Sequence, residues 1–201
     1  MIEKRAITSR PVDDLLARRW SGRAFDPDKH VTRDQLLSIL EAARWAPSCW
    51  NDQPWRYLVW DKNDDAESYK KGFECVSENN KKWVVNSSVL MCAIASHRFT
   101  HNDKPNRWGE YDSGAASMSI CLQAVSLGLM AHQMAGFDKD MVIEKFNVPE
   151  NYTPMAMIAI GVPVNSIDDV PEENRERELA ERSRNPLGNR FFDGTWGAGI
   201  E

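Results

Sequence analysis

The sequence predicts an α+β fold, in which helices and strands follow one another without regular alternation. Its 201 residues are enough for a single domain, residues 1–201, with a core of its own. Two helical segments come first, and apolar strand-like runs are interleaved with helices after them. The steady strand–helix alternation of a doubly wound sheet is missing, and so is the G-x-G-x-x-G loop of a classical dinucleotide fold.

The N-terminal half is expected to begin with two helices. The first is short, covers residues 13–19 and follows Pro11. The second covers residues 32–45, where Thr32 and Gln35 match a capping box and apolar residues recur at helical spacing. The next expected elements are a strand over residues 55–60 and a turn over residues 61–65.

The C-terminal half contains the longest apolar runs and the most regular helix. Residues 89–95 are continuously apolar, which predicts a strand buried on both faces. Residues 112–127 predict a helix rich in Ala and Ser, with Gly128 as its C-terminal cap. Further expected elements are strands over 129–135 and 155–160, a helix over 138–146, a charged and largely solvated helix over 170–183, and an extended tail over 185–201.

Composition excludes several classes of protein. A net charge of −5 argues against a dedicated nucleic-acid binder, and no apolar run is long enough to cross a bilayer. No secretory signal is visible, and the four cysteines are scattered without a C-x-x-C pair, so we expect reduced thiols in a cytoplasmic protein. His97 and His101 stand four apart but have no third ligand nearby, so no metal site is expected.

Four segments carry polar residues that could bind a ligand. Residues 18–26 hold three arginines and Ser21, which suit a phosphate or, equally, a solvated helix end. Residues 46–55 form a proline-bounded loop that could contact a heteroaromatic ring or merely satisfy its own backbone. Residues 127–138 place Ala-Gly after a strand, which leaves backbone N–H groups free unless the turn is an ordinary one. Residues 182–187 hold two arginines on one side of an extended segment, or a solvated charge run.

Together these segments resemble the FMN-dependent nitroreductase-like oxidoreductases, over most of the chain from Val12 to Leu187. The most specific motifs are R-x-S-x-R-x-F, A-P-S-x-x-N-x-Q-P-W and, over residues 149–163, P-x-x-Y-x-P-x-A-x-I-x-I-G-x-P. The resemblance implies a central mixed, mainly antiparallel sheet flanked by helices. It also implies an intertwined homodimer that shares its active site and exchanges its C-terminal tails.

The resemblance also implies roles for individual residues. FMN would be held at its phosphate and pyrimidine end by Arg19, Ser21 and Arg23, with Trp20 where relatives often have a polar residue, and by Arg182 and Arg184. Backbone N–H groups of Ala135 and Gly136 would lie beside N5 of the flavin, near Asn80 or, in another register, Asn79. The residues expected to reach the flavin from the other subunit are Pro47, Ser48, Cys49 and Asn51.

The implied activity transfers a hydride from NADH or NADPH to bound FMN and then to a small nitroaromatic, quinone or similar electron-poor acceptor. No catalytic side chain is needed, because the flavin performs the chemistry. Trp50, Trp108 and Tyr111 are candidate walls of the acceptor site, although aromatic residues serve a core equally well. The alternatives are a specialised relative, either flavin-consuming or reductively dehalogenating, and a non-catalytic flavin-binding dimer.

Overall fold

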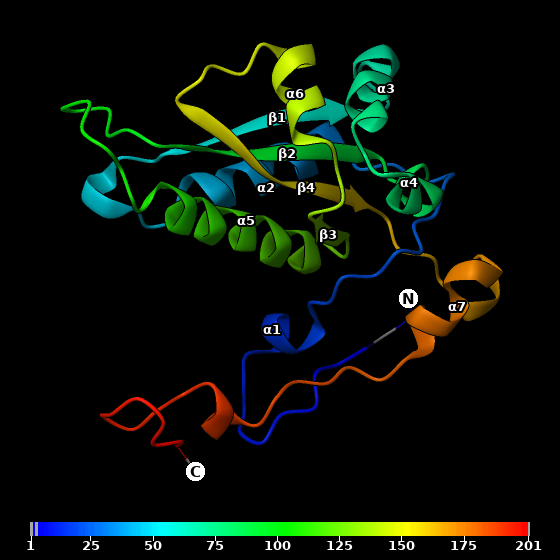
Figure 1. The fold of residues 1–201 in the computed structure, drawn as a ribbon. Coiled ribbons are helices and arrows are strands. Elements are labelled where there is room, and N and C mark those ends of the chain that lie inside the picture. The colour runs from blue at the N-terminus through cyan, green and yellow to red at the C-terminus, as the bar shows by residue number, and fades with distance from the viewer. Residues whose placement is uncertain (1, 3, 201) are drawn as a thin grey trace.

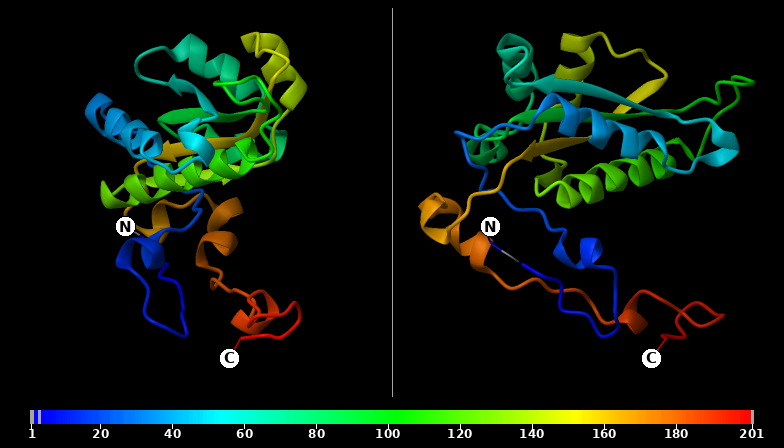
Figure 2. Two further views of the ribbon diagram at one scale, coloured as in Figure 1. Left: turned by 90° about the vertical axis from the view of Figure 1, so that its left-hand side faces the viewer. Right: turned by 180° about the vertical axis from the view of Figure 1, so that it is seen from behind.

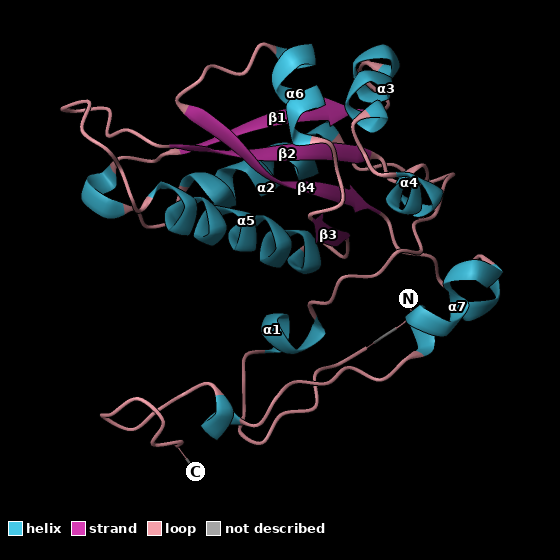
Figure 3. Cartoon of the chain, in the orientation of Figure 1, coloured by secondary structure: helices cyan, strands magenta, loops and turns pink. Residues whose placement is uncertain are grey.

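A four-stranded sheet lies between two layers of helices in the computed structural model, which describes residue 2 and residues 4–200 (Figure 1, Figure 3). The strand order is β1-β2-β4-β3, and each of the three pairings is antiparallel. The strands are β1 (Trp55–Asp61), β2 (Val89–Ser96), β3 (Met130–Met134) and β4 (Tyr152–Gly161). The α+β class and the mainly antiparallel sheet are therefore confirmed.

The two faces of the sheet carry different helices. The α2 helix (Arg33–Arg44) and the α5 helix (Gly109–Ser126) pack on one face, where Met91 contributes to a cluster with Leu36 and Ile120. The opposite face, to which Cys92 contributes, carries α3 (Ala66–Glu74), α4 (Glu78–Val84) and α6 (Lys139–Phe146). Successive side chains of a strand point to opposite faces, so every residue of β2 is buried, as its apolar run predicts.

Local signals set several element ends where the sequence predicts them. The Thr32 side chain and Gln35 form the capping box of α2, and the Asp138 side chain accepts a hydrogen bond from Met141 at the start of α6. Gly128, with φ of 73°, follows α5. The β4 strand begins at Tyr152 rather than residue 155, because its first residue still pairs with Ser96 of β2.

Two helices are missing from the sequence-based prediction. Both α3 and α4 are short and rich in charged or polar residues, so their apolar periodicity is weak. Their few apolar side chains nevertheless reach the core, as Tyr69 of α3 and Trp83 of α4 show with 5% and 3% exposure. The sheet face supplies the burial that stabilises them, which single-sequence periodicity does not reveal.

The chain ends lie outside the three layers. The N-terminal arm, α1 (Asp14–Arg18), α7 (Glu172–Leu179) and the C-terminal tail occupy one side of the molecule, below α5 in Figure 1 and again in both views of Figure 2. The remaining short turns are η1 (Cys49–Asn51), η2 (Ile167–Asp169) and η3 (Leu187–Asn189). The charged α7 is less solvated than expected, because Asn174 and Glu178 are buried. Among the described residues, no helix combines the length and apolar character that crossing a membrane requires.

Candidate functional site

The segment that follows α1 presents two arginines predicted to bind phosphate. Arg19 donates from Nη1 to Oγ of the exposed Ser21 at 3.4 Å. The carbonyl of Gly22 turns inward and forms a 2.9 Å hydrogen bond with Nδ1 of His132. Arg23 is half-buried, and its guanidinium lies 5.9 Å from the centre of the Trp83 ring. Burial lowers the pKa of Arg23, and Arg177 lowers it further.

The second arginine pair comes from the C-terminal segment and lies beside the first. Arg182 donates from Nη2 to the carbonyl of Arg19 at 2.8 Å and from Nη1 to the carbonyls of Ala17, at 2.8 Å, and Lys4. Burial lowers the pKa of Arg182, and the charges of Arg19 and Arg184 lower it further. Arg184 is exposed. Segments that are distant in sequence thus converge on one place.

We call Arg19, Arg23, Arg182 and Arg184 the arginine cluster. In the part of the chain that the structure describes, no carboxylate lies within ion-pair distance of any of the four guanidinium groups. Arg18, the other arginine of this segment, is instead paired with Asp14 at 2.6 Å. The buried carboxylate of Glu178 accepts the backbone N–H of Arg23 at 2.9 Å, and its charge opposes the lowering of the Arg23 pKa. One acid among four guanidinium groups still leaves excess positive charge, which favours a bound anion.

The turn after β3 has two backbone donors to offer. Across residue 2 and residues 4–200, the N–H groups of Ala135 and Gly136 donate to no other protein group. Asn80 contacts this turn, because its Nδ2 donates to the carbonyl of Gly136 at 3.1 Å, whereas Asn79 is exposed. The fit is close: a Cβ at Gly136 would lie 2.5 Å from Nδ2 of Asn80 and 2.8 Å from Oγ of Ser77.

His132 and Trp83, which the sequence analysis does not single out, connect the turn to the arginine cluster. Their rings stack with centroids 4.5 Å apart, and Nε1 of Trp83 donates to Oδ1 of Asn80 at 3.3 Å. Burial lowers the pKa of His132 to about 4, and the charges of Arg23 and Arg19 act in the same direction. The imidazole is therefore neutral at pH 7. The sequence feature that could have identified this residue is a histidine inside an otherwise apolar strand.

The proline-bounded loop has an unusual backbone. Trp50, Asn51 and Gln53 all have positive φ, at 56°, 53° and 50°, and each costs roughly 1–2 kcal/mol for a residue with a side chain. The loop satisfies part of its own polarity, because Oγ of Ser48 accepts the N–H of Gln53 at 3.0 Å and Oδ1 of Asn51 accepts Nε2 of Gln53 at 3.2 Å. Pro47 precedes them and is exposed.

Two buried carboxylates hold this strained loop in place. Asp52 is 8% exposed and accepts hydrogen bonds from the N–H and hydroxyl of Thr100, at 2.8 and 2.7 Å, and from Nδ2 of Asn106 at 3.3 Å. Asp112, near the start of α5, accepts the N–H of Cys49 at 3.0 Å. Charged acceptors of this kind form the stronger hydrogen bonds in proteins, and here they offset the backbone strain.

The predicted acceptor-site aromatics gather at this end of α5 and stay exposed. Trp50, Trp108 and Tyr111 are 82%, 43% and 77% exposed. They are separate from the arginine cluster in one chain. Asp112 accepts the N–H of Cys49 in the loop, whereas the charge of Arg19 acts on the pKa of Cys121. Asp112 and Cys121 lie about 14 Å apart along the axis of α5.

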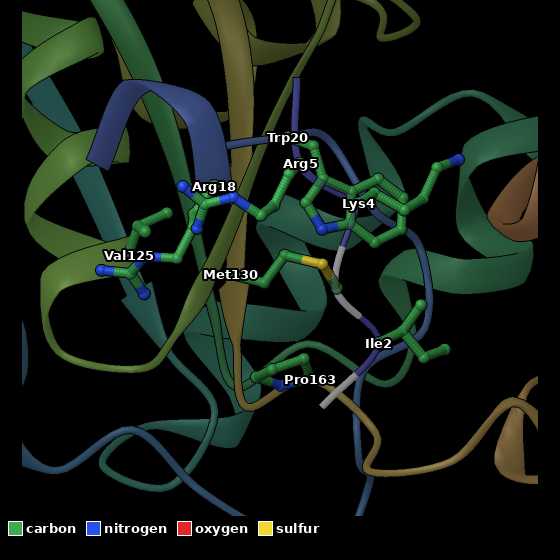
Figure 4. Close-up of a pocket in the computed structure, with 8 residues that line it drawn as sticks. All are labelled: Ile2, Lys4, Arg5, Arg18, Trp20, Val125, Met130 and Pro163. Carbon is green, nitrogen blue, oxygen red and sulfur yellow. The ribbon is translucent and has the colours of Figure 1, made fainter. Parts of the chain in front are cut away.

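Trp20 lies between Arg19 and Ser21 in the sequence. Its ring lines a small pocket with Lys4, Val125 and Met130 (Figure 4), and Nζ of Lys4 lies 4.7 Å from the ring centre. The close-up shows the Trp20 ring and the Met130 thioether together in that pocket. The Met130 thioether and the Trp20 ring both lie close to Gly22. A Cβ added at Gly22 would lie 2.3 Å from Sδ of Met130 and 2.9 Å from the Trp20 ring.

Metal-binding and thiol chemistry find little support among the described residues. These residues include no group of three His, Cys, Asp or Glu side chains that could hold a metal ion. His97 contacts the hydroxyl of Thr153 at 2.6 Å instead. All four cysteines are free, three of them buried, and burial raises the pKa of Cys92 to about 12.

Comparison with known proteins decides the family. The model of the nitroreductase family matches residues 16–162, which is most of the chain. The chain belongs to the nitroreductase family. This nitroreductase-family chain contains within the matched region both the arginine segment after α1 and the turn after β3.

Individual relatives agree with that assignment. A crystal structure described as an oxidoreductase containing FMN is 37% identical, has a TM-score of 0.86, and covers 94% of this chain and 95% of its own. YdgI of Bacillus subtilis, provisionally named an NAD(P)H nitroreductase, is 26% identical over 74% of this chain and 86% of its own length. The CLA biosynthesis enone reductase of Lactiplantibacillus plantarum is 24% identical over 74% of this chain and 83% of its own length.

Proposed function

We propose that this chain is an NAD(P)H-dependent flavoprotein oxidoreductase that uses FMN. The observation that supports this most directly is the arginine cluster, which collects unpaired positive charge beside a turn with free backbone donors. The phosphate of FMN carries about two negative charges at neutral pH. Membership of the nitroreductase family, together with a relative described as containing FMN, also supports FMN as the cofactor.

The residues present fit FMN in charge and in shape. Arg19, Ser21, Arg23 and Arg184 would hold the phosphate and pyrimidine end, because guanidinium groups match phosphate oxygens in a planar fork. Ala135 and Gly136 would approach the ring through their backbone, since neither has a large side chain to keep it away. Bound FMN would supply hydride transfer between NADH or NADPH and an acceptor.

The protein's own contribution would be binding, orientation and electrostatics. The arginine cluster would favour negative charge on the cofactor in both redox states. Neutral His132 and Trp83 would keep the arginine segment and the 135–136 turn at a fixed separation, since they join the Gly22 carbonyl to Asn80. No nucleophile and no general acid–base side chain is required.

We also propose a homodimer with a shared active site and tail exchange. The loop at Pro47, Ser48, Cys49 and Asn51 is bound to Asp112 near the start of α5, away from the arginine cluster, and would act on the partner's cofactor. Large apolar side chains are exposed on the arm and tail, with Ile7 at 74% and Trp196 at 89%. Such surface normally marks an interaction site. Free thiols support a cytoplasmic location.

The acceptors we propose are small, planar and electron-poor, such as nitroaromatics, quinones and enones. Trp50 supports this class, because its backbone is strained and its ring is 82% exposed, so the fold gains little from it locally. Strain of this kind is typical of functional sites. Trp108 and Tyr111 would extend the same aromatic wall.

An absorption spectrum tests the proposal. The purified protein, or protein incubated with FMN, is expected to be yellow, and anaerobic addition of NADH or NADPH is expected to bleach the flavin band. A protein that binds no added FMN would overturn the proposal. A protein that binds FMN but is bleached by neither nicotinamide would instead be a non-catalytic flavin-binding dimer.

A further inference from the structure

The C-terminal segment, residues 162–182, runs beside residues 17–26, which contain Arg19 and Arg23. The N–H of Asp26 donates to the carbonyl of Val162 at 2.8 Å, and the N–H of Val164 donates to the carbonyl of Ala24 at 3.1 Å. Ala24 and Val164 share a small buried cluster with Val170. The two segments are therefore packed together before α7 begins.

Glu178 of α7 continues this contact through a buried carboxylate. The residue is 1% exposed, and its Oε1 accepts the backbone N–H of Arg23 at 2.9 Å. Its second oxygen, Oε2, has no hydrogen-bond partner in the described structure. Burying a carboxylate this deeply is costly, and it is positioned to fix the backbone of Arg23.

Arg182 completes the contact at the other end of the segment. Its guanidinium donates to three carbonyl oxygens, those of Lys4, Ala17 and Arg19. Carbonyl oxygens repel an anion, so drawing them toward a cation turns their negative ends away from a phosphate site. These bonds use three of the five N–H groups of the guanidinium, so most of its donors hold the backbone.

We propose that Arg182 and Glu178 are positioning residues that fix the backbone of residues 17–23, so that Arg19, Ser21 and Arg23 form the anion site. This inference rests on the proposed function for the identity of the anion as the FMN phosphate. It assigns Arg182 a role that differs from the direct phosphate contact implied by its motif. The C-terminal segment thereby couples its own docking to cofactor affinity.

Conservative replacement separates geometry from charge. Arg182→Lys keeps the net charge, and an ammonium binds phosphate well as a point charge, but it cannot reproduce a fork on three carbonyls. The control is Arg33→Lys, at the exposed start of α2. We expect Arg182→Lys to weaken FMN binding, measured by fluorescence titration, by about tenfold or more, and Arg33→Lys to change it by less than about twofold.

Amide hydrogen exchange of the FMN-free protein provides a readout that does not depend on the cofactor. Residues 17–23 are expected to exchange faster in Arg182→Lys than in wild type, while the β2 strand exchanges as before. Unchanged exchange in this segment, or FMN affinity equal to wild type, would overturn the proposal. If wild-type protein binds no FMN, the proposed function fails, and exchange still decides whether the segment is held by Arg182.

Glu178 gives a second, independent pair of variants in case Arg182→Lys does not fold. Glu178→Gln keeps a carbonyl oxygen for the N–H of Arg23, whereas Glu178→Leu removes it. We expect the Arg23 amide to remain protected in the first variant and to lose protection in the second. Equal protection in both would show that Glu178 does not hold this backbone.

Discussion

His132 offers a titration test of how the arginine segment is held. Its imidazole is 7% exposed, hydrogen-bonds to the carbonyl of Gly22 at 2.9 Å and stacks on Trp83. Burial lowers its pKa to about 4 in the folded protein, with help from Arg23 and Arg19. In an unfolded chain the pKa of histidine is about 6.5.

The sign of the effect follows from these two pKa values. Between about pH 6.5 and pH 4 the unfolded chain binds a proton that the folded protein does not, so acid favours unfolding. The stability from neutral His132 is fully present above pH 6.5 and is lost as the pH falls to 4. A difference of about 2.5 between the pKa values, at 1.36 kcal/mol each, corresponds to about 3 kcal/mol.

The perturbation is His132→Asn, which keeps a side-chain donor for the Gly22 carbonyl and removes the titration. Urea unfolding of the FMN-free protein would be followed at about pH 7, 5.5 and 4.5, with the exposed His30→Asn as the matched control. We expect wild type to be the more stable protein at pH 7 and this advantage to shrink by about 2–3 kcal/mol at the acid end. Stability curves that stay parallel over this range would refute the reasoning.

Three further substitutions test the site. Arg19→Ala is expected to weaken FMN binding by about 1.5–3 kcal/mol, the range for a charged hydrogen bond, and unchanged affinity in a fluorescence titration would place the phosphate elsewhere. Gly136→Ala is expected to lower stability by about 1–3 kcal/mol in thermal unfolding, because its Cβ would crowd Asn80; a fully stable variant would contradict the close fit. Trp50→Ala is expected to retain FMN and lose about fivefold in kcat/KM for planar acceptors, roughly 1 kcal/mol of ring stacking, whereas Trp45→Ala, 75% exposed on the end of α2, should change neither; a loss of FMN in Trp50→Ala would assign the loop to the cofactor instead.

The elements with strong local signals were predictable from the sequence. The capping box of Thr32 and Gln35, the apolar run of β2 and the Gly128 terminus all appear where local chemistry indicates. These features depend on residues close together in the chain, so one sequence is enough to reveal them. The helices α3 and α4 were missed, because their stability comes from a sheet face made by distant residues.

The candidate site shows the same division. The motifs predict which segments contain arginines, small residues and aromatic rings, but their functional roles stay predictions. Asn80 rather than Asn79 faces Gly136 only because α4 docks with Trp83 against His132. Trp20 lies against Lys4 and Met130, a contact that no motif position indicates.

The sequence by itself determined the family, the order of most elements and the two arginine-bearing segments, because motifs and periodicity are local properties of the chain. The tertiary structure alone decided that the Arg182 guanidinium donates to three carbonyl oxygens. It also decided that Glu178 is buried, although its helix is charged and was expected to be largely solvated. Those contacts join residues more than a hundred positions apart. Their geometry depends on how whole layers pack, so only the folded chain specifies them.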